Sequence, residues 1–88
     1  MAFVYILRSQ KNNRFYIGST VNLSRRLLQH NEGQVVATKY IRPLEIVFSQ
    51  EFEKEEDARS IEYRLKSFKS RKIIEQIIKD GRIKITGR

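Results

Sequence analysis

The side chains of greatest chemical interest in this 88-residue chain are two tyrosines, an arginine, a histidine and a glutamate. Tyr5 and Tyr16 lie in two short apolar segments joined by a predicted turn. Arg26 follows the second tyrosine by ten residues, and His30 follows Arg26 by four. Glu62 lies farther along, on a helical pattern. Together these groups can bind a phosphate, move a proton and hold a cation, so their types and order suggest a nuclease.

The two tyrosines are expected on one face of a β-hairpin. If Asn12 and Asn13 form a two-residue turn, for which positive φ at asparagine is suitable, Tyr5 lies opposite Thr20. Directly opposed residues share a face, so Tyr5 and Tyr16 share one. A four-residue loop gives the same result, whereas a three-residue loop separates them. The alternative is that both are ordinary strand residues, which tyrosine favours.

Arg26 and His30 are four residues apart on a predicted helix and therefore share one of its faces. A guanidinium can hold a phosphate through two parallel hydrogen bonds and stays charged. His30 has two readings: it relays a proton or contacts a phosphate, or it is an ordinary histidine at the negative end of a helix.

A tyrosine acting as a base needs a nearby cation, because its ordinary pKa is about 10. The candidates are Arg8, Arg25, Arg26 and a metal ion on Glu62.

Glu62 lies at the border of the apolar stripe of its predicted helix, one residue after Ile61 and four after Ala58. This position predicts a side chain that points partly inward, towards the sheet face that bears the tyrosines. In one reading Glu62 binds a magnesium ion, which keeps several waters and takes one or two carboxylates plus substrate oxygens. In the other, Glu62 forms an ion pair with Lys66 one turn later, worth ~0.3–0.5 kcal/mol.

Periodicity and turn residues predict a mixed α/β chain of the α+β type, with three strands and three helices. In the third strand, Ile46 and Phe48 are expected on one face and Val47 on the other. We expect one domain over residues 1–80 and a basic tail over 81–88, which fits a short strand or a mobile arm. The expected strands cover 3–9, 15–20 and 44–52, a loop covers 34–43, and the helices cover 23–32, 54–68 and a segment between Ser70 and Gly81.

Composition limits the possible functions. A chain of this length buries only roughly 60–65% of its unfolded surface, so an active site must lie near the surface. Cysteine is absent and the first apolar run is too short for a membrane span, so we expect a cytoplasmic protein with no membrane partner. The formal charge of +8 divides into +6 over residues 1–44, −5 over 45–62 and +7 over 63–88. This distribution suggests a polyanion partner and a local place for a cation; a merely basic surface is the alternative.

Taken in order, these segments resemble the motifs of the GIY-YIG nucleases, particularly small stand-alone members similar to the N-terminal nuclease domain of the bacterial excision-repair incision subunit. The resemblance extends from Phe3 to about Ile78. Any one match is weak, but the ordered set at compatible spacing is specific. The matching segments are Val4-Tyr5-Ile6, with Val4 in place of glycine; Tyr16-Ile17-Gly18; Leu23-Ser24-Arg25-Arg26-Leu27; Lys39-Tyr40, Arg42-Pro43 and Leu44-Glu45-Ile46-Val47-Phe48; and Glu62-Tyr63-Arg64-Leu65-Lys66.

The resemblance implies a three-stranded, largely antiparallel sheet flanked by about three helices, and metal-dependent hydrolysis of a phosphodiester. By that resemblance, Tyr5 would help to activate the attacking water, and Tyr16 would support it or the phosphate. Arg26 would stabilise charge on the phosphate, and Glu62 would bind the divalent metal. His30 stands where some members have a histidine and others a tyrosine.

We therefore expect a magnesium- or manganese-dependent DNA endonuclease in repair or in the processing of structured DNA, with RNA as a further candidate partner. The main rival is a non-catalytic nucleic-acid-binding module on the same scaffold, and a protein-interaction domain is a third reading. Ser19 stands where the repair nuclease has a lysine, which leaves the source of tyrosine activation open. The expected nucleic-acid contacts are Arg25, Arg26, Lys39, Tyr40, Arg42, Lys66, Lys69, Arg71 and Lys72.

Overall fold

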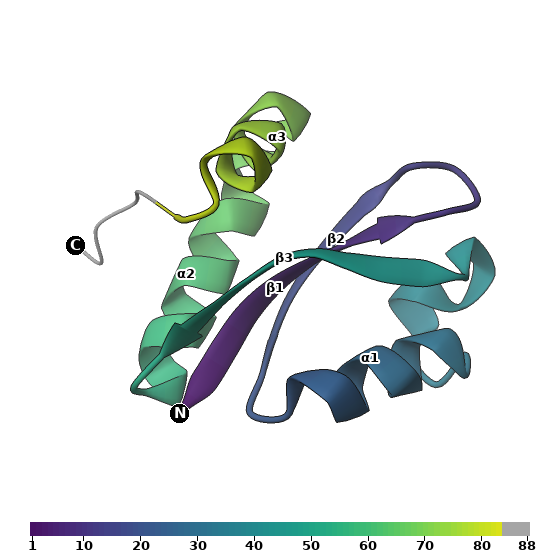
Figure 1. Ribbon diagram of the computed structural model, residues 1–88, viewed down its shortest axis with the longest axis horizontal. Coiled ribbons are helices and arrows are strands. Elements are labelled where there is room, and N and C mark those ends of the chain that lie inside the picture. Colours follow the sequence, from purple (N-terminus) through teal and green to yellow (C-terminus); the bar gives the residue numbers. More distant parts are fainter. Residues whose placement is uncertain (84–88) are drawn as a thin grey trace.

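The computed structural model describes residues 1–83, and these form one antiparallel sheet between helices. Figure 1 shows α2 and α3 on one side of the sheet and α1 on the other. The expected α+β class and three-stranded sheet are confirmed, with a short 3-10 helix, η1, in the segment expected to be a loop. In chain order the elements are β1 (Ala2–Ser9), β2 (Phe15–Thr20), α1 (Leu23–Asn31), η1 (Val36–Ile41), β3 (Leu44–Phe52), α2 (Glu55–Phe68) and α3 (Arg71–Asp80), and the strand order is β2-β1-β3.

Local signals place the ends of the helices. Asn22 caps α1 by accepting a hydrogen bond from the backbone N–H of Arg25 at 3.1 Å. Ser70 caps α3 in the same way, accepting from the N–H of Ile73 at 3.3 Å. Gly81 follows α3 with a φ of 76°, a conformation that glycine adopts without steric cost. The observed ends of strands and helices lie within one residue of those predicted.

The β1–β2 hairpin differs from the predicted register by two residues, and the reason is its loop. Tyr5 pairs with Gly18 rather than with the residue two places on. The backbone N–H of Ser9 donates to the carbonyl of Arg14 at 2.8 Å, so the loop has four residues, 10–13, and not two. The Ser9 hydroxyl accepts hydrogen bonds from two loop amides, which stabilises the longer loop. A shift of two residues leaves every side chain on its predicted face.

Strand β3 contains a bulge that the sequence pattern did not indicate. Ile6 pairs with Phe48 and the next residue, Leu7, pairs with Ile46, so Val47 is an extra residue in β3. Phe48 packs in the core beneath α2 and α3, whereas Ile46 packs in the cluster on the opposite face. The prediction that Ile46 and Phe48 share a face is wrong, because the bulge reverses the alternation at Val47.

Both faces of the sheet are covered. On the α2 and α3 face, Val4 and Ile6 of β1 belong to the larger core. On the α1 face, Tyr5 and Leu7 belong to a smaller cluster that partly buries Tyr16. The expected catalytic tyrosines therefore lie within one of the two hydrophobic layers, which fixes their positions through packing.

The described part of the chain ends in the larger core. Ile83 is 8% exposed, and its backbone N–H donates to the side-chain oxygen of Gln50 at 2.8 Å. The first residues of the predicted tail therefore pack against the domain. The rest of that tail, residues 84–88, with its predicted strand or arm, lies outside the described residues. No helix within residues 1–83 is long and apolar enough to cross a membrane.

Candidate active site

Tyr5 extends from the central strand over its neighbour β2, and Gly18 leaves the space that it needs. The two residues are paired across the β1–β2 ladder. A Cβ atom at position 18 would lie 2.5 Å from the ring carbon Cζ of Tyr5 and closer still to the hydroxyl. Such a separation is a steric clash, so the glycine that ends the Tyr16-Ile17-Gly18 motif allows the Tyr5 hydroxyl to lie over β2.

The Tyr5 hydroxyl begins a buried chain of hydrogen bonds. Its oxygen lies 2.9 Å from Nε2 of His30, and Nδ1 of His30 lies 2.7 Å from Oγ1 of Thr38. The Thr38 hydroxyl donates to the carbonyl of Val35 at 3.5 Å. Nδ1–H of His30 is therefore the donor to Thr38, which leaves Nε2 to accept the Tyr5 proton. Tyr5, His30 and Thr38 are each at most 2% exposed, so this chain is preformed in the core.

Arg26 covers the Tyr5 hydroxyl from α1. Its Nε–H donates to the Tyr5 oxygen at 3.4 Å, and one terminal nitrogen donates to Oε1 of Gln29 at 3.1 Å. Arg26 and His30 approach Tyr5 from the same helix face, as their spacing predicted. The bond to Tyr5 is long for a hydrogen bond, and Arg26 is half-buried. The guanidinium can therefore turn towards a phosphate while the contact between Tyr5 and His30 remains.

Burial and the Arg26 charge set the protonation of this chain. Burial raises the pKa of Tyr5 above its ordinary value of 10.0, and the hydrogen bond and charge of Arg26 oppose the rise. Burial, followed by the Arg26 charge, lowers the pKa of His30 to about 4. Tyr5 is thus a neutral phenol and His30 a neutral imidazole at pH 7. His30 is wholly buried, so the suggestion that it contacts a phosphate is wrong. Because it is neutral, it also does not act as a cation that balances the dipole of α1.

Tyr16 lies on the same sheet face and links the buried chain to α2. Its ring meets that of His30 edge-on, with centroids 5.1 Å apart, and the centroid of the Tyr5 ring lies 5.8 Å from that of His30. Nζ of Lys66, from α2, lies 5.4 Å from the centroid of the Tyr16 ring. The prediction that the two tyrosines share a face is confirmed by their common contact with His30. Arg8, another candidate cation, is instead paired with Glu45 at 2.6 Å.

Glu62 has a hydrogen-bond partner on each carboxylate oxygen. Oε1 accepts from the Ser19 hydroxyl at 2.5 Å, and Oε2 pairs with Nζ of Lys66 at 2.7 Å. The Glu62 side chain is 21% exposed, which agrees with its predicted place at the border of the apolar stripe. The ion pair with Lys66 that the spacing suggested is therefore present, and it is close to the surface.

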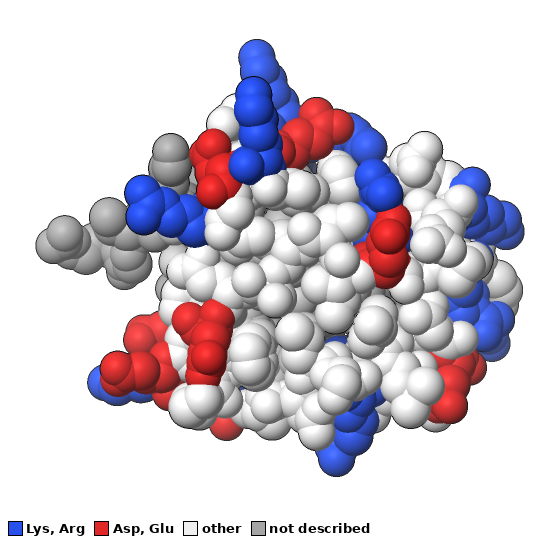
Figure 2. All heavy atoms as spheres, in the orientation of Figure 1, with Lys and Arg blue, Asp and Glu red and all other residues white. Residues whose placement is uncertain are grey.

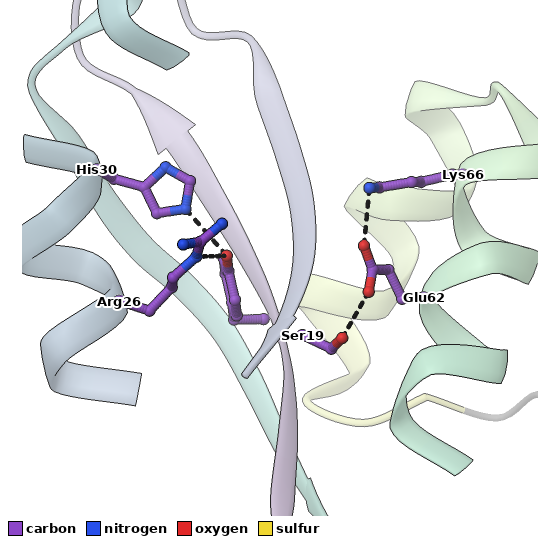
Figure 3. Close-up of polar contacts among 6 residues, drawn as sticks. Ser19, Arg26, His30, Glu62 and Lys66 are labelled. Carbon is purple, nitrogen blue, oxygen red and sulfur yellow. Dashed lines mark hydrogen bonds and ion pairs between the residues drawn. The ribbon is translucent and has the colours of Figure 1, made fainter. Parts of the chain in front are cut away.

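Glu62 and Tyr5 approach β2 from opposite faces of the sheet. Ser19 pairs with Val4, whose side chain lies in the core beneath α2. Figure 3 shows His30 on one side of the β2 ribbon and Glu62 with its partners on the other. The prediction that Glu62 points to the tyrosine face is wrong, because successive strand residues alternate between faces and Glu62 bonds to the one after Gly18.

The donor set around Glu62 fits a hard divalent cation. A carboxylate and the Ser19 hydroxyl offer oxygen atoms at the surface, which is the chemistry that Mg²⁺ and Mn²⁺ prefer. Within residues 1–83, no three His, Cys, Asp or Glu side chains are grouped so as to hold a metal. Glu62 would therefore be the single protein carboxylate on a cation that takes its other ligands from water and substrate.

Part of the predicted nucleic-acid surface lines a groove between β2 and the junction of α2 and α3, called the β2 groove below. Its volume is about 380 Å³, and its lining includes Tyr16 and the predicted contacts Lys66, Lys69 and Arg71. Arg14, which sequence reasoning missed, also lines it, and none of the acidic residues within 1–83 does. The β2 groove therefore presents four cationic side chains directly beside a proposed catalytic tyrosine.

Arg71 also has a structural role in this groove. Its guanidinium carbon lies 4.3 Å from the centroid of the Phe15 ring. It donates to the carbonyl of Asn13 at 2.9 Å and to the carboxylate of Glu75 at 3.0 Å. Arg71 therefore holds the hairpin loop against α3, so its removal is expected to disturb the groove as well as its charge.

A second group of predicted contacts lines the Tyr40 hollow, a depression of about 350 Å³ formed by Lys11, Lys39, Tyr40, Arg42 and Pro43. Tyr40 is 75% exposed. Lys11 donates to the Tyr40 carbonyl at 3.2 Å, and Arg42 donates to the Lys39 carbonyl at 2.8 Å. The hairpin loop thus lies between the two basic depressions, touching Tyr40 through Lys11 and Arg71 through Asn13.

The remaining predicted contacts, Arg25 and Lys72, are exposed on α1 and α3 and line neither depression. Figure 2 shows Lys and Arg side chains along the right edge, over the hairpin tip and η1, and at the top over α3. Acidic side chains gather at the lower left, over the start of α2. Acidic side chains also lie among the cations at the top and at the lower right (Figure 2), so on this face the basic side chains follow the right edge and the top without forming a patch free of acidic ones.

Two further residues shape the site, and the sequence alone did not predict the role of either. Gly18 lies in a recognised motif, but its role as the space for Tyr5 requires the strand pairing. Thr38 gave no signal, because its contact with His30 depends on how η1 folds back onto α1. A polar residue eight positions after a histidine has no regular geometric relation to it unless both lie in one element.

The comparisons with known proteins identify the family and the fold. A family model for the GIY-YIG catalytic domain matches residues 1–74. A UPF0213 protein of Pediococcus pentosaceus is 38% identical over 65 residues, which cover 73% of this chain and 67% of the relative. A UPF0213 protein of Bacillus velezensis is 37% identical over 81 residues, covering 91% and 80%. The solution NMR structure of a UPF0213 protein from Bacillus halodurans has a TM-score of 0.56 and 32% identity, covering 90% of this chain and 84% of that one.

The fold and the motif residues together define a GIY-YIG catalytic domain. The chain belongs to the GIY-YIG family, and within it to the UPF0213 proteins, which are small stand-alone members. Membership of this nuclease domain family indicates endonuclease activity and a nucleic-acid substrate. Nucleases of the family typically use divalent metal ions.

Proposed function

We propose that this protein is a metal-dependent DNA endonuclease, with Mg²⁺ or Mn²⁺ held by Glu62, acting in repair or on structured DNA in the cytoplasm. The observation that carries the proposal is the buried chain from Arg26 through Tyr5 to His30. It places a proton acceptor behind a phenol and a guanidinium beside it. A module that only binds nucleic acid needs exposed cations, and in such a module the buried chain would contribute to stability alone.

In the proposed reaction, the Tyr5 oxygen takes a proton from the attacking water while its own proton moves to Nε2 of His30. The water oxygen forms a bond to phosphorus, the bond from phosphorus to the leaving sugar oxygen breaks, and that oxygen takes a proton from solvent. The proton on His30 then returns to the Tyr5 oxygen, which releases the proton from water to solvent. Arg26 turns to the phosphate and stabilises the charge that develops on it. Glu62, which reaches β2 from the other face of the sheet, would hold the divalent cation, and that cation would supply Lewis-acid stabilisation of charge on the phosphate.

The pKa values set the direction of this relay. Burial raises the pKa of Tyr5 above its ordinary value and lowers that of His30 to about 4, so in the free protein the proton rests on the phenol. In the proposed reaction the proton is on His30 only transiently. Arg26 lowers the pKa of both groups, so its pairing with a phosphate raises the proton affinity of His30 and of the Tyr5 oxygen together.

Tyr16 is assigned a supporting role towards Tyr5 or the phosphate. The β2 groove and the Tyr40 hollow are proposed to hold the nucleic-acid strand on either side of the hairpin loop. Exposed Tyr40, with Nζ of Lys39 at 5.6 Å from its ring, combines a stacking surface with a cation. We take the nuclease domain as residues 1–80, with the basic segment 81–88 following it.

Cleavage assays test the proposal directly. Labelled linear and branched DNAs are incubated with Mg²⁺, Mn²⁺ or chelator, using the wild type and Glu62→Gln. We expect wild-type cleavage that chelator abolishes, and a loss of several orders of magnitude in Glu62→Gln, since metal stabilisation of phosphate charge is worth several kcal/mol. Normal cleavage by Glu62→Gln would remove the metal assignment. Good binding without cleavage under every metal condition would favour the non-catalytic rival.

Binding assays test the basic surface separately. Each phosphate contact on duplex DNA lowers log K by about 0.9 per unit of log salt. We expect a slope that corresponds to roughly three to six contacts, of which Lys66 and Lys69 in the β2 groove and Lys39 in the Tyr40 hollow are candidates. Binding that does not depend on salt, or no binding at low salt, contradicts any nucleic-acid role.

A further inference from the structure

We propose that Lys66 is the resident counter-ion of Glu62, and that its displacement couples cation binding at Glu62 to the binding of a substrate phosphate. This inference rests on the proposed function, because it takes a cation on Glu62 and a polyanionic substrate as given. The observation behind it is the position of one ammonium group. Nζ of Lys66 lies 2.7 Å from Oε2 of Glu62 and 5.4 Å from the Tyr16 ring centroid, and its side chain lines the β2 groove.

Each oxygen of Glu62 already accepts one hydrogen bond, so a cation must share the carboxylate with two partners. Ser19 donates to Oε1 and Lys66 pairs with Oε2. The Ser19 hydroxyl can stay beside a carboxylate that binds a metal, because the lone pairs of its own oxygen can also contact the cation. An ammonium group cannot, because it has no lone pair and carries a like charge. Lys66 is therefore the partner that must leave.

The contacts of Lys66 make its departure easy. Its side chain is 47% exposed, against 21% for Glu62, and the two residues form a single i,i+4 pair on the surface of α2. Such pairs typically contribute well under 1 kcal/mol, so a divalent cation can compete for the carboxylate. The long flexible stem of lysine lets Nζ move while its backbone stays in the helix.

The surroundings indicate where the released ammonium group finds a new partner. The β2 groove beside it is lined by three further cations, Arg14, Lys69 and Arg71, and by no acidic side chain from the described part of the chain. An anion in that groove is therefore the natural partner, and on a nucleic acid that anion is a phosphate. A phosphate that holds Lys66 frees Glu62 for the cation, and a cation on Glu62 frees Lys66 for the phosphate. The two affinities then increase each other by the same factor.

Manganese binding tests this coupling without relying on cleavage. Mn²⁺ affinity is measured by electron paramagnetic resonance for proteins that carry Tyr5→Phe to prevent turnover, with and without a short DNA strand. We expect DNA to raise the Mn²⁺ affinity of this background protein by about fivefold or more. Lys66→Met should raise the affinity of the DNA-free protein by a similar factor and reduce the further gain from DNA to the part that direct contact between phosphate oxygens and Mn²⁺ supplies. Lys66→Arg, which keeps the counter-ion, should behave as the parent protein does.

Lys69→Met is the matched control, because it removes a groove lysine on the same side of the molecule that does not touch Glu62. Its Mn²⁺ affinity without DNA should stay within about twofold of the parent protein, as expected for a screened surface charge. An equal gain for Lys69→Met and Lys66→Met would overturn the inference, since it would reflect general charge. So would unchanged affinity in Lys66→Met.

Glu62→Gln separates failure of this inference from failure of the proposed function. If Glu62→Gln loses Mn²⁺ binding while Lys66→Met matches the parent protein, the metal site stands and the counter-ion role is wrong. If Glu62→Gln binds Mn²⁺ as well as the parent protein does, or if neither protein binds it even with DNA present, the metal assignment and the coupling both fail.

Discussion

On the α1 side of β2, Tyr5, His30 and Thr38 are at most 2% exposed, whereas on the α2 side the side chains of Glu62 and Lys66 are 21% and 47% exposed. The first group has one hydrogen-bonded arrangement that packing enforces. The second has carboxylate partners at the surface that water, a cation or a phosphate can replace. Groups that must keep one geometry and one resting protonation state are thus placed in the core, and groups that must exchange partners are placed at its edge.

This difference has energetic consequences. Removing one partner from a buried hydrogen bond leaves a polar atom unsatisfied, at a cost of about 1–3 kcal/mol. Removing one partner from an exposed i,i+4 ion pair costs ~0.5 kcal/mol or less. Substitutions on the α1 side are therefore expected to change stability and activity together, whereas those on the α2 side should change activity and cation affinity with little effect on stability.

The largest expected effect is on catalysis through Tyr5. Tyr5→Phe keeps the ring under Arg26 but removes the hydroxyl that passes the proton to His30, so cleavage should fall by about 10²- to 10⁴-fold. DNA affinity should stay within about twofold, because no cation is lost. Single-turnover cleavage and equilibrium binding measure the two quantities. A cleavage rate within tenfold of the wild type would show that the buried chain is structural only.

The next effect is a pH dependence of stability caused by His30. Its pKa is about 4 in the folded protein and about 6.5 when unfolded, so the unfolded state binds more protons between these values. The contribution of neutral His30 is complete above pH 6.5 and is lost as the pH falls towards 4, amounting to about 3 kcal/mol. Denaturant unfolding at several pH values measures it. His30→Gln serves as the control, because it shares every other titration. If its stability fell as steeply as that of the wild type over this window, His30 would not be the cause.

A smaller effect is expected at Gly18. Gly18→Ala places a methyl group against the Tyr5 ring and hydroxyl, so we expect a loss of about 1–3 kcal/mol in stability from overpacking. In the Tyr5→Phe background the nearest clashing atom is absent, and Gly18→Ala should cost less than in the wild type. A double-mutant cycle by chemical denaturation measures this coupling. Strict additivity would mean that the alanine is accommodated by movement of β2 and not at the expense of Tyr5.

The smallest effect is expected for the stability of the α2 side. Glu62→Gln and Lys66→Met should each change the free energy of unfolding by no more than ~0.5 kcal/mol, since they break an exposed pair. Thermal unfolding should therefore shift by only about 2–4 °C in a domain of this size. A loss above 2 kcal/mol in either variant would show that the Glu62 group is as integral to the core as the Tyr5 chain, and the contrast between the two sides would disappear.

Sequence reasoning placed the strands and α-helices within a residue of their ends, because those ends depend on local signals. The Asn22 and Ser70 caps and the glycine after α3 act on groups three or four residues away. The same reasoning placed both tyrosines on one face, since a face depends only on whether the loop length is even. It favoured a two-residue loop over the four-residue loop that forms, and it missed the bulge at Val47, because both depend on hydrogen bonds between strands.

The residues available for chemistry, their order and their helix faces were thus determined by the sequence alone, as was the basic charge that points to a polyanion. Only the tertiary structure decided that His30 is buried and neutral, that Thr38 sets its tautomer, and that Glu62 lies across β2 from Tyr5. These outcomes depend on contacts between residues 8 to 43 positions apart in the chain. Such contacts arise from how whole elements pack, and neither periodicity nor propensity carries information about that packing.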